Sequence, residues 1–435
     1  MQLGASMTSF AASKGTWMMV DGEWYCYDKN GDAYENVFCS SNGKEYYVGE
    51  DGQLVHSSWV EYDSSYYFVN SSGAKITNDW RLTTPYDDDS ADEDEYWYYL
   101  KKATGKPATG KQSNINGQIY LFNKYGQMQY GWVAEATDSD VKFLRLDEDD
   151  NEIAMEEATG KVYYCGDEDD GHAKKNKWTK TWLPDNTSEE DDDKEWFWFD
   201  KDGVLFRAAD DKGSATASDA WKYKLDEGTL KKDANESTGV ISKKKVNSKD
   251  YWFTKDGVML SKFYLINDAM YYFGGSDDGS MKTGSQSIKN NTSDTYKFYF
   301  YTKDQATSYK TPDGKHGLSK GAGVVGNQGN KLYWYGLQIQ ADDYKYQVAT
   351  ITINGTDYSF IVNSNGTIQH SANTEYKEDG DVLVKTGAYT QKDKDGKDVV
   401  IPTTFVKDGQ AKYAIEDTNT IKKDVIDVDL GKFFQ

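Results

Sequence analysis

Tryptophan and tyrosine are the residues of this chain whose type and spacing could do chemistry. Clusters of aromatic residues recur, each followed by a turn of Gly, Asn and Asp and often by a lone Trp. The clusters include Trp24-Tyr25-Cys26-Tyr27, Tyr46-Tyr47, Tyr66-Tyr67-Phe68, Trp97-Tyr98-Tyr99, Tyr120-Leu121-Phe122, Trp196-Phe197-Trp198-Phe199, Tyr251-Trp252-Phe253 and Tyr271-Tyr272-Phe273. The face of an aromatic ring attracts a cation, and Trp does so best. The residues therefore favour non-covalent recognition.

The overall charge narrows the class of ligand. The chain has 50 Lys and Arg residues against 72 Asp and Glu residues, a formal net charge of −22. Nucleic acids and anionic membranes attract basic surfaces, so neither is an expected partner. No apolar run is long enough to cross a membrane. Cationic or neutral ligands fit the charge, although the acidic residues could instead keep an aromatic surface soluble.

The acidic residues and histidines do not suggest catalysis. A glycosidase needs two carboxyl groups facing each other across a cleft, whereas here the acids cluster in loop-like runs such as Asp92–Glu95 and Glu189–Asp193. The four histidines are scattered over different repeats. We therefore expect no enzyme activity and no cofactor. Calcium is the one metal considered, at Asp28–Asp32 and Asp393–Asp398, but neither segment has the closing Glu of a calcium loop and both read more simply as turns.

The three cysteines, Cys26, Cys39 and Cys165, form no zinc-binding pattern. Cys26 and Cys39 could bridge neighbouring hairpins. The alternative, which we favour, is that all three are small buried apolar residues.

The elements that carry the rings are predicted to be β-hairpins. Asn42-Gly43 and Asn116-Gly117 stand between apolar runs, and such pairs are the strongest short-range signal for a hairpin. One hairpin is only marginally stable, so its apolar face must stack on the next hairpin. The sequence thus predicts an all-β, elongated solenoid of stacked β-hairpin repeats with acidic loop insertions.

The expected organisation has four parts. Residues 1–13 read as a truncated signal-peptide remnant or a flexible N-terminus, because Ser9-Phe10-Ala11 resembles a small-residue cleavage site. Residues 14–285 form the aromatic hairpin array, and residues 286–370 form degenerate repeats. The strands become rich in β-branched residues after about Tyr344, and residues 371–435 form a C-terminal β cap or a small β-domain.

One stretch carries a specific resemblance. Residues 116–133 contain a glycine turn, the aromatic strand Tyr120–Phe122, a second glycine turn and Gly131-Trp132, in this order. This phrase resembles the cell-wall-binding repeat family of Gram-positive surface proteins, also called choline-binding or glucan-binding repeats. The resemblance extends over residues 15–370 with interruptions, and Gly131-Trp132 is its only full Gly-Trp pair.

The resemblance implies aromatic cages for choline between successive hairpins. It implies that one ring comes from the Gly-Trp position and others from the aromatic strands. Mapped onto this sequence, the candidate ligand rings are Trp59, Tyr67, Trp80, Trp97, Tyr120 and Trp132. The leading hypothesis is a secreted or surface-displayed, non-catalytic protein that binds cell-wall choline or glycan.

The alternative hypothesis is a bacterial surface protein that binds a host protein, such as an immunoglobulin or a glycoprotein. Repeat arrays recognise proteins through what varies between units, and here the loops vary: Tyr86–Glu95, Asp147–Glu157, Asp167–His172 and Pro184–Asp193. Tyr96, Trp182 and Trp196 lie beside these loops and are the candidate protein contacts.

Overall fold

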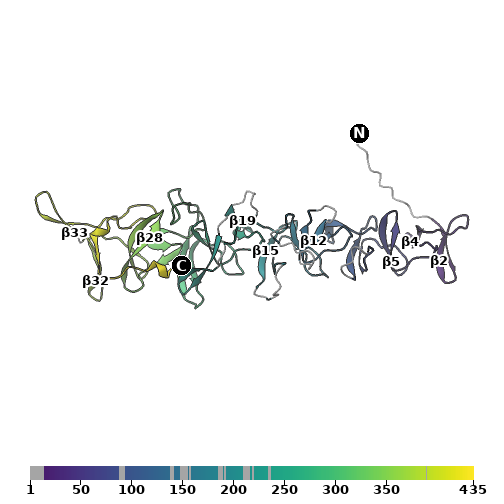
Figure 1. The fold of residues 1–435 in the computed structure, drawn as a ribbon, viewed down its shortest axis with the longest axis horizontal. Helices are drawn as coiled ribbons and strands as arrows, with labels where there is room; N and C mark the ends of the chain where they lie inside the picture. The colour runs from purple at the N-terminus through teal and green to yellow at the C-terminus, as the bar shows by residue number, and fades with distance from the viewer. Residues whose placement is uncertain are drawn as a thin grey trace, which may run out of the picture. The chain divides into compact units, whose positions relative to one another are not determined.

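The computed structural model describes residues 14–87, 94–137, 142–146, 155, 158–184, 190, 193–208, 216–217, 220–233, 237–387 and 389–435. The predicted all-β class is confirmed, because these residues form short β-strands joined by turns (Figure 1). Helix in the described residues is confined to short 3-10 turns, such as η4 (Thr418–Thr420) and η5 (Leu430–Lys432). The expected signal-peptide remnant and most of the acidic insertions lie outside the described residues.

The chain divides into two compact units. Unit 1 comprises Met1–Lys194 and Trp198–Leu205, and unit 2 comprises Glu195–Phe197 and Phe206–Gln435. The division falls within β15 (Glu195–Phe199). The boundaries expected from the sequence, after residues 285 and 370, remain predictions.

Unit 1 is a succession of antiparallel hairpins that follow one another in chain order (Figure 1). The paired strands are β1 (Thr16–Val20) with β2 (Glu23–Tyr27), β3 (Val37–Ser41) with β4 (Lys44–Val48), β5 (Ser58–Tyr62) with β6 (Ser65–Val69), β7 (Asp79–Thr83) with β8 (Tyr96–Leu100), and β9 (Gly110–Ile115) with β10 (Gln118–Phe122). After them, β11 (Trp132–Glu135) pairs with β12 (Phe143–Arg145) and β13 (Val162–Tyr164), and β14 (Lys177–Thr181) follows.

The turns explain why these residues form hairpins. Asn42 and Gly43 both have positive φ, 50° and 76°, as do Asn116 and Gly117, at 51° and 82°. Two central residues with positive φ make the type I′ turn, whose twist matches that of the strands it joins. Strand residues alternate between the two faces of a hairpin, so adjacent rings of an aromatic cluster lie on opposite faces.

A second kind of turn stacks one hairpin on another. In the loop after β4, the Leu54 N–H donates to the Trp24 carbonyl at 2.9 Å, and after β6 the Lys75 N–H donates to the Glu45 carbonyl at 2.8 Å. The Met128 N–H reaches the Trp97 carbonyl in the same way, at 2.9 Å. These three loops therefore bond back to the preceding hairpin, which confirms the predicted stacking of hairpin repeats.

Unit 2 contains larger sheets. One has the order β16 (Thr216–Ala217), β19 (Ile241–Val246), β20 (Lys249–Phe253), and another β18 (Thr229–Lys232), β17 (Ala220–Asp226), β21 (Phe263–Ile266), β22 (Ala269–Tyr272). A five-stranded sheet has the order β23 (Gly284–Lys289), β24 (Thr295–Phe300), β27 (Leu337–Ile339), β26 (Lys331–Trp334), β25 (Gly326–Gln328). The remaining sheets are β28 (Tyr346–Ile353), β29 (Thr356–Asn363), β30 (Ile368–Gln369); β31 (Glu375–Glu378), β32 (Asp381–Thr386), β35 (Ile421–Lys423); and β33 (Tyr389–Lys392), β34 (Asp398–Ile401).

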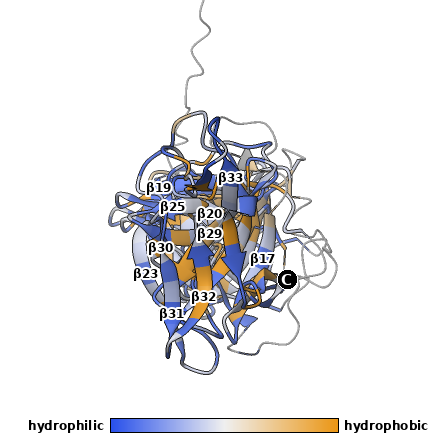
Figure 2. Ribbon diagram, turned by 90° about the vertical axis from the view of Figure 1, so that its left-hand side faces the viewer, coloured by the Kyte–Doolittle hydropathy of each residue, from blue (hydrophilic) through white to orange (hydrophobic). Residues whose placement is uncertain are grey.

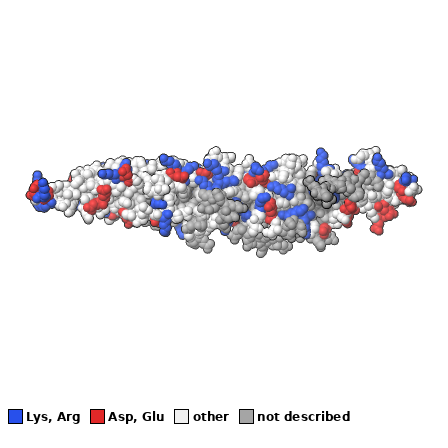
Figure 3. All heavy atoms as spheres, turned by 90° about the horizontal axis from the view of Figure 1, so that it is seen from above, with Lys and Arg blue, Asp and Glu red and all other residues white. Residues whose placement is uncertain are grey.

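The core of unit 2 is more aliphatic than that of unit 1. Ile351, Phe360 and Val362 of β28 and β29 are buried, as is Val384 of β32. The apolar segments of β29 and β32 appear orange in Figure 2. The strands after residue 344 thus bury mainly aliphatic and β-branched side chains. On the face seen in Figure 3, acidic and basic side chains lie interspersed.

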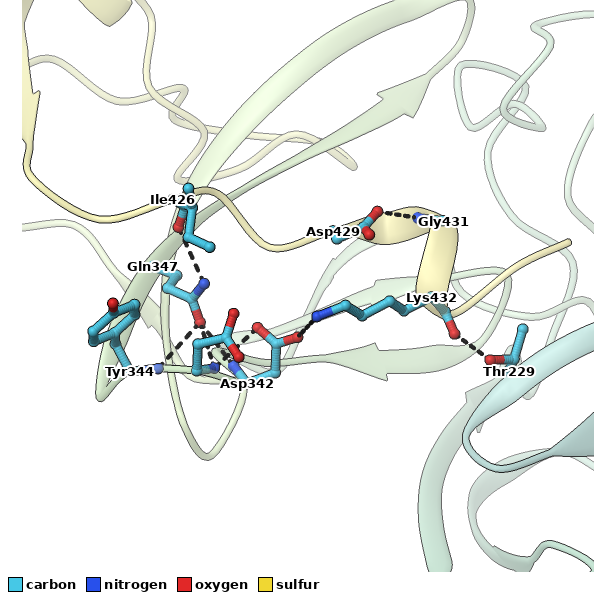
Figure 4. Close-up of polar contacts among 9 residues, drawn as sticks. Thr229, Asp342, Tyr344, Gln347, Ile426, Asp429, Gly431 and Lys432 are labelled. Atoms are coloured by element: carbon cyan, nitrogen blue, oxygen red, sulfur yellow. Dashed lines mark hydrogen bonds and ion pairs between the residues drawn. The ribbon is translucent and has the colours of Figure 1, made fainter.

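Hydrogen bonds and an ion pair hold the segment from Ile426 to Lys432 against other residues of unit 2 (Figure 4). The buried Gln347 side chain accepts the Asp342 N–H at 2.8 Å and donates to the Ile426 carbonyl at 3.1 Å. Lys432 pairs with Asp342 at 3.3 Å, and its carbonyl accepts the Thr229 hydroxyl. The last residues therefore bond to strands from the start of unit 2.

Candidate ligand-binding site

Aromatic side chains from successive hairpins of unit 1 meet at equivalent positions in the strand register. Each meeting point combines one residue of a hairpin's first strand, one of its second strand, one ring of the next hairpin and one residue of the loop that follows this next hairpin. We call these points cage A (Trp17, Trp24, Tyr46, Leu54), cage B (Phe38, Glu45, Tyr67, Lys75), cage C (Trp59, Tyr66, Tyr98, Pro107) and cage D (Trp80, Trp97, Tyr120, Met128).

Cage A is open. Its residues line a hollow of about 420 Å³, in which the rings of Trp17 and Tyr46 lie 5.7 Å apart at 71°. Trp24 is 41% exposed. The indole N–H of Trp17 is buried and has no hydrogen-bond partner among the described residues. His56 lines the same hollow. Cage A therefore offers two indole faces and a phenol to a small ligand.

Cage D has two tryptophans and a tyrosine, as cage A does. The centroid of the Trp80 ring lies 4.7 Å from that of Tyr120 and 6.4 Å from that of Trp97, and both ring pairs meet edge-to-face. A hollow of about 220 Å³ opens beside Trp97 and Met128. Three exposed carboxylates line it, those of Glu95, Glu168 and Asp169. An aromatic surface with an acidic rim suits a cation, because the rings and the carboxylates both attract positive charge.

Cage B already contains a cation. The Lys75 ammonium lies 5.0 Å from the Phe38 ring centroid and 5.3 Å from that of Tyr67, and it forms an ion pair with Glu45. Only 12% of the Lys75 side chain is exposed. Burial raises the pKa of the Tyr67 hydroxyl, so this ring remains a neutral phenol in the physiological range.

Cage C is filled by a ring from the β7–β8 connection. Tyr86 stacks on Tyr66 at 4.2 Å and meets Trp59 edge-on at 5.0 Å. Its hydroxyl donates to the Tyr125 carbonyl at 2.7 Å, and burial raises its pKa to about 12. The Trp59 indole N–H donates to the Thr84 carbonyl at 2.9 Å, two residues before Tyr86.

The six candidate ligand rings thus separate into several environments. Trp80, Trp97 and Tyr120 come together in cage D. Tyr67 lies in the Lys75-filled cage, and Trp59 lies in the Tyr86-filled cage.

Trp132, the ring of the only full Gly-Trp pair, differs from the other five candidates. It is 3% exposed, and its indole N–H donates to the Trp182 carbonyl at 2.7 Å. Its ring packs against Tyr164 at 5.0 Å and Phe199 at 6.0 Å. The structure therefore places Trp132 in the core, because the next cluster of the chain covers it.

Three residues that line cage A were not among the candidate ligand rings: Trp17, Trp24 and Tyr46. The register that places Trp80 and Trp97 in cage D places Trp17 and Trp24 in cage A. Trp17 follows Gly15-Thr16 instead of a Gly-Trp pair. The seven-residue spacing from Trp17 to Trp24, which recurs from Trp59 to Tyr66, was the available signal.

The candidate protein contacts are placed as follows. Tyr96 is half-buried at the start of β8. The Trp182 indole donates to the Glu190 carbonyl at 2.9 Å, with the Lys194 ammonium 4.0 Å from its ring centroid. In unit 2, the Trp196 indole donates to Asp277 at 2.9 Å. Each of these side chains has contacts within its own unit.

The segments considered for calcium are turns in the structure. Asp28 accepts the N–H groups of Asn30 and Asp32, and Asp393 accepts those of Asp395 and Lys397. Such contacts are typical of Asx turns. Among the described residues no group of three or more His, Cys, Asp or Glu side chains is placed to hold a metal ion.

The cysteines are free thiols and buried. Burial raises the pKa of Cys26 and of Cys39, which contact each other across two hairpins. This agrees with the favoured expectation of buried apolar cysteines. Within the described part of the chain, no helix is long and apolar enough to span a membrane.

Comparisons with known proteins give distant relatives. No family model matches the chain. It is 26% identical over 442 residues to Glucosyltransferase-I of Streptococcus downei, which covers 84% of this chain and 24% of the relative. It is 33% identical over 112 residues to Glucosyltransferase-S of Streptococcus mutans serotype c, covering 26% of this chain and 7% of the relative. The chain thus spans about a quarter or less of the length of these relatives.

Among solved structures, the choline-binding domain of CbpL from Streptococcus pneumoniae is 23% identical, and the match covers 61% of this chain and 96% of that domain with a TM-score of 0.30. The fold assignment therefore rests on the hairpins of this chain and not on this superposition. With those hairpins and the streptococcal relatives, the resemblance found in the sequence is confirmed: the repeats of this chain resemble the cell-wall-binding repeats of Gram-positive surface proteins.

Proposed function

We propose that this chain is a non-catalytic binding array of the bacterial cell surface that holds quaternary ammonium groups of wall polymers, such as choline, in cages A and D. The proposal covers the binding region only. It assigns binding to the rings of unit 1 and no reaction to the acidic residues.

The occupancy of cage B by Lys75 is the observation that carries the proposal. A cage of this array holds an ammonium group between two ring faces and a carboxylate. Cages A and D have equivalent positions, with Leu54 or Met128 in place of Lys75. They therefore present rings in the same arrangement without an internal cation. A quaternary ammonium suits them, because its charge is diffuse and its methyl groups lose little on leaving water.

Size and charge agree with a small cation. The hollow of cage A, about 420 Å³, exceeds the space that a trimethylammonium group needs and leaves room for the polymer attached to it. Beside cage D, the carboxylates of Glu95, Glu168 and Asp169 favour positive charge. Both features support a cationic ligand over an anionic one.

A glycan is the second candidate ligand. The similarity to a glucosyltransferase extends over 84% of this chain, and the exposed face of Trp24 could stack on a sugar ring. The host-protein alternative gains no support from the relatives described above.

Retention on two resins tests the proposal. The protein should bind choline-substituted resin and elute with free choline, and Trp24→Ala together with Trp80→Ala should abolish retention. Met18→Ala is the matched control, because Met18 is 46% exposed and lies on the opposite face of β1 from Trp17.

Dextran resin separates the two ligands. Binding to dextran but not choline would replace the proposed ligand with a glycan. Binding to neither resin would contradict the proposed function. Release of reducing sugar from purified wall or glucan by the pure protein would contradict the non-catalytic part.

A further inference from the structure

We propose that Lys75 and Tyr86 close cages B and C from within the chain, so that the first five hairpins leave only cages A and D open to a ligand. The inference rests on the proposed function and deepens it, because it names the residues that set the number and position of the binding sites.

The position of Lys75 in the register shows how cage B is closed. Lys75 forms a β-bridge with Val69, as Leu54 does with Val48 and Met128 with Phe122. At this position Leu54 gives cage A an apolar side chain, and Met128 gives cage D one. A lysine there extends its ammonium between the rings, and Glu45 stands where cages A and D have Trp24 and Trp97. The second cage therefore contains both a cation and its counter-ion.

The ion pair is well suited to exclude a ligand. The Lys75 side chain is 12% exposed and that of Glu45 is 32% exposed, so the pair is partly withdrawn from water. Screening by salt is weaker for such a pair than for an exposed one. An external ammonium would have to displace a charge that the chain itself holds at high effective concentration.

Tyr86 closes cage C by filling it. Its ring makes face and edge contacts with Tyr66 and Trp59, and it lies 6.0 Å from Tyr98. The hydroxyl bond to the Tyr125 carbonyl fixes the ring from the far side. A ring bonded in this way occupies the place between Trp59 and Tyr66 that an ammonium would take, and the polar end of the side chain is satisfied.

Counting binding sites tests the inference. Choline binding to the whole protein is measured by isothermal titration calorimetry, with Lys75→Met, Tyr86→Ala and the double variant. Each single substitution should raise the stoichiometry by one site and the double variant by two. Lys75→Met places at residue 75 the side chain that cage D has at residue 128, and it leaves Glu45 to attract the ligand. Lys44→Met is the control, since Lys44 is exposed and lies next to Glu45 at the turn between β3 and β4.

The possible outcomes separate the inference from the proposed function. Wild-type binding with an unchanged count in all variants would overturn the inference alone. If only the variants bind choline, the claim that cages A and D are open would be overturned, whereas the claim that Lys75 and Tyr86 block cages B and C would be supported. No binding by any variant would overturn both.

If the variants fail to fold, proton NMR of the unsubstituted protein tests the closure of cage B. The ε-methylene protons of Lys75, assigned by their loss in Lys75→Met, should shift upfield because ring currents act on groups above Phe38 and Tyr67. Random-coil shifts for these protons would overturn the closure of cage B.

Discussion

At the residue scale, one position of the repeat separates cage B from cages A and D. Leu54, Lys75, Pro107 and Met128 share one place in the register. Leucine and methionine line a cage, whereas lysine enters it as a cation. The same backbone can thus carry an open or a closed site according to a single side chain. A resemblance that identifies the repeat therefore does not identify which repeats bind.

Trp132 provides a prediction at this scale. Because it is 3% exposed and bonded to Trp182, Trp132→Ala should lower the free energy of unfolding by about 3–5 kcal/mol. Choline affinity of the folded protein should change little. Urea unfolding and choline titration of the same variant measure the two effects. A variant of normal stability that has lost choline binding would show that Trp132 is a ligand contact.

The cysteines provide a second residue-scale prediction. Burial raises the pKa of Cys26 and Cys39, and the thiolate is the reactive form. At pH 8 a thiol reagent should therefore label the native protein at least about ten times more slowly than the urea-unfolded protein. Labelling is followed by mass spectrometry. Fast labelling of either residue in the native protein would contradict the described burial.

At the element scale, glycine turns maintain the stacking of the hairpins. Gly117 has φ +82°, and a Cβ added there would meet nothing within 4 Å. Gly126 has φ +78°, and its Cβ would come 2.7 Å from the Pro107 Cβ. The first turn shapes one hairpin, whereas the second also packs against the preceding loop.

This difference predicts unequal costs for the same substitution. Gly117→Ala should destabilise by about 1–2 kcal/mol, the cost of a side chain in the left-handed region. Gly126→Ala should cost about 1–3 kcal/mol more, because the methyl group also overpacks the loop. Chemical denaturation of both variants measures the difference. Equal costs would mean that the contact with Pro107 relaxes freely.

Much of this element-scale organisation could be predicted from the sequence. Pairs such as Asn42-Gly43 fix two-residue turns by local backbone preference, so the hairpins and the all-β class follow. Trp80, Trp97 and Tyr120 were candidates because of the resemblance to cell-wall-binding repeats. The closure of cage C did not follow, because Tyr86 belongs to no repeat phrase and reaches its cage from an insertion. The burial of Trp132 depends on Trp182, which lies fifty residues later.

At the scale of the whole molecule, buried tyrosines couple stability to alkaline pH. Burial raises the pKa of several tyrosines from the ordinary value of 10.0, and that of Tyr86 reaches about 12. The others with large upward shifts are Tyr98, Tyr163, Tyr264, Tyr301 and Tyr335. A raised pKa in the folded state means that the folded protein binds protons that the unfolded chain has released.

Stability from these groups should therefore be full below pH 10 and fall as the pH rises through 10 towards 12. Thermal unfolding followed by circular dichroism at pH 8, 10 and 11 measures this effect. Tyr86→Phe should flatten part of the decline, because the variant lacks one of the titrating hydroxyls. A melting temperature that stays constant from pH 8 to pH 11 would contradict the burial of these hydroxyls.

The proline of cage C has a mechanical consequence. Leu54, Lys75 and Met128 each donate an N–H to the preceding hairpin, but Pro107 has no N–H to give. The rung between the third and fourth hairpins is thus absent from the backbone. Side chains bridge the same joint: the Trp59 indole donates to the Thr84 carbonyl, and the Lys106 ammonium donates to the Ser65 hydroxyl. Of the four joints between the first five hairpins, this one is held by side-chain contacts without the backbone rung, so it should yield first when that part of the stack is pulled lengthwise.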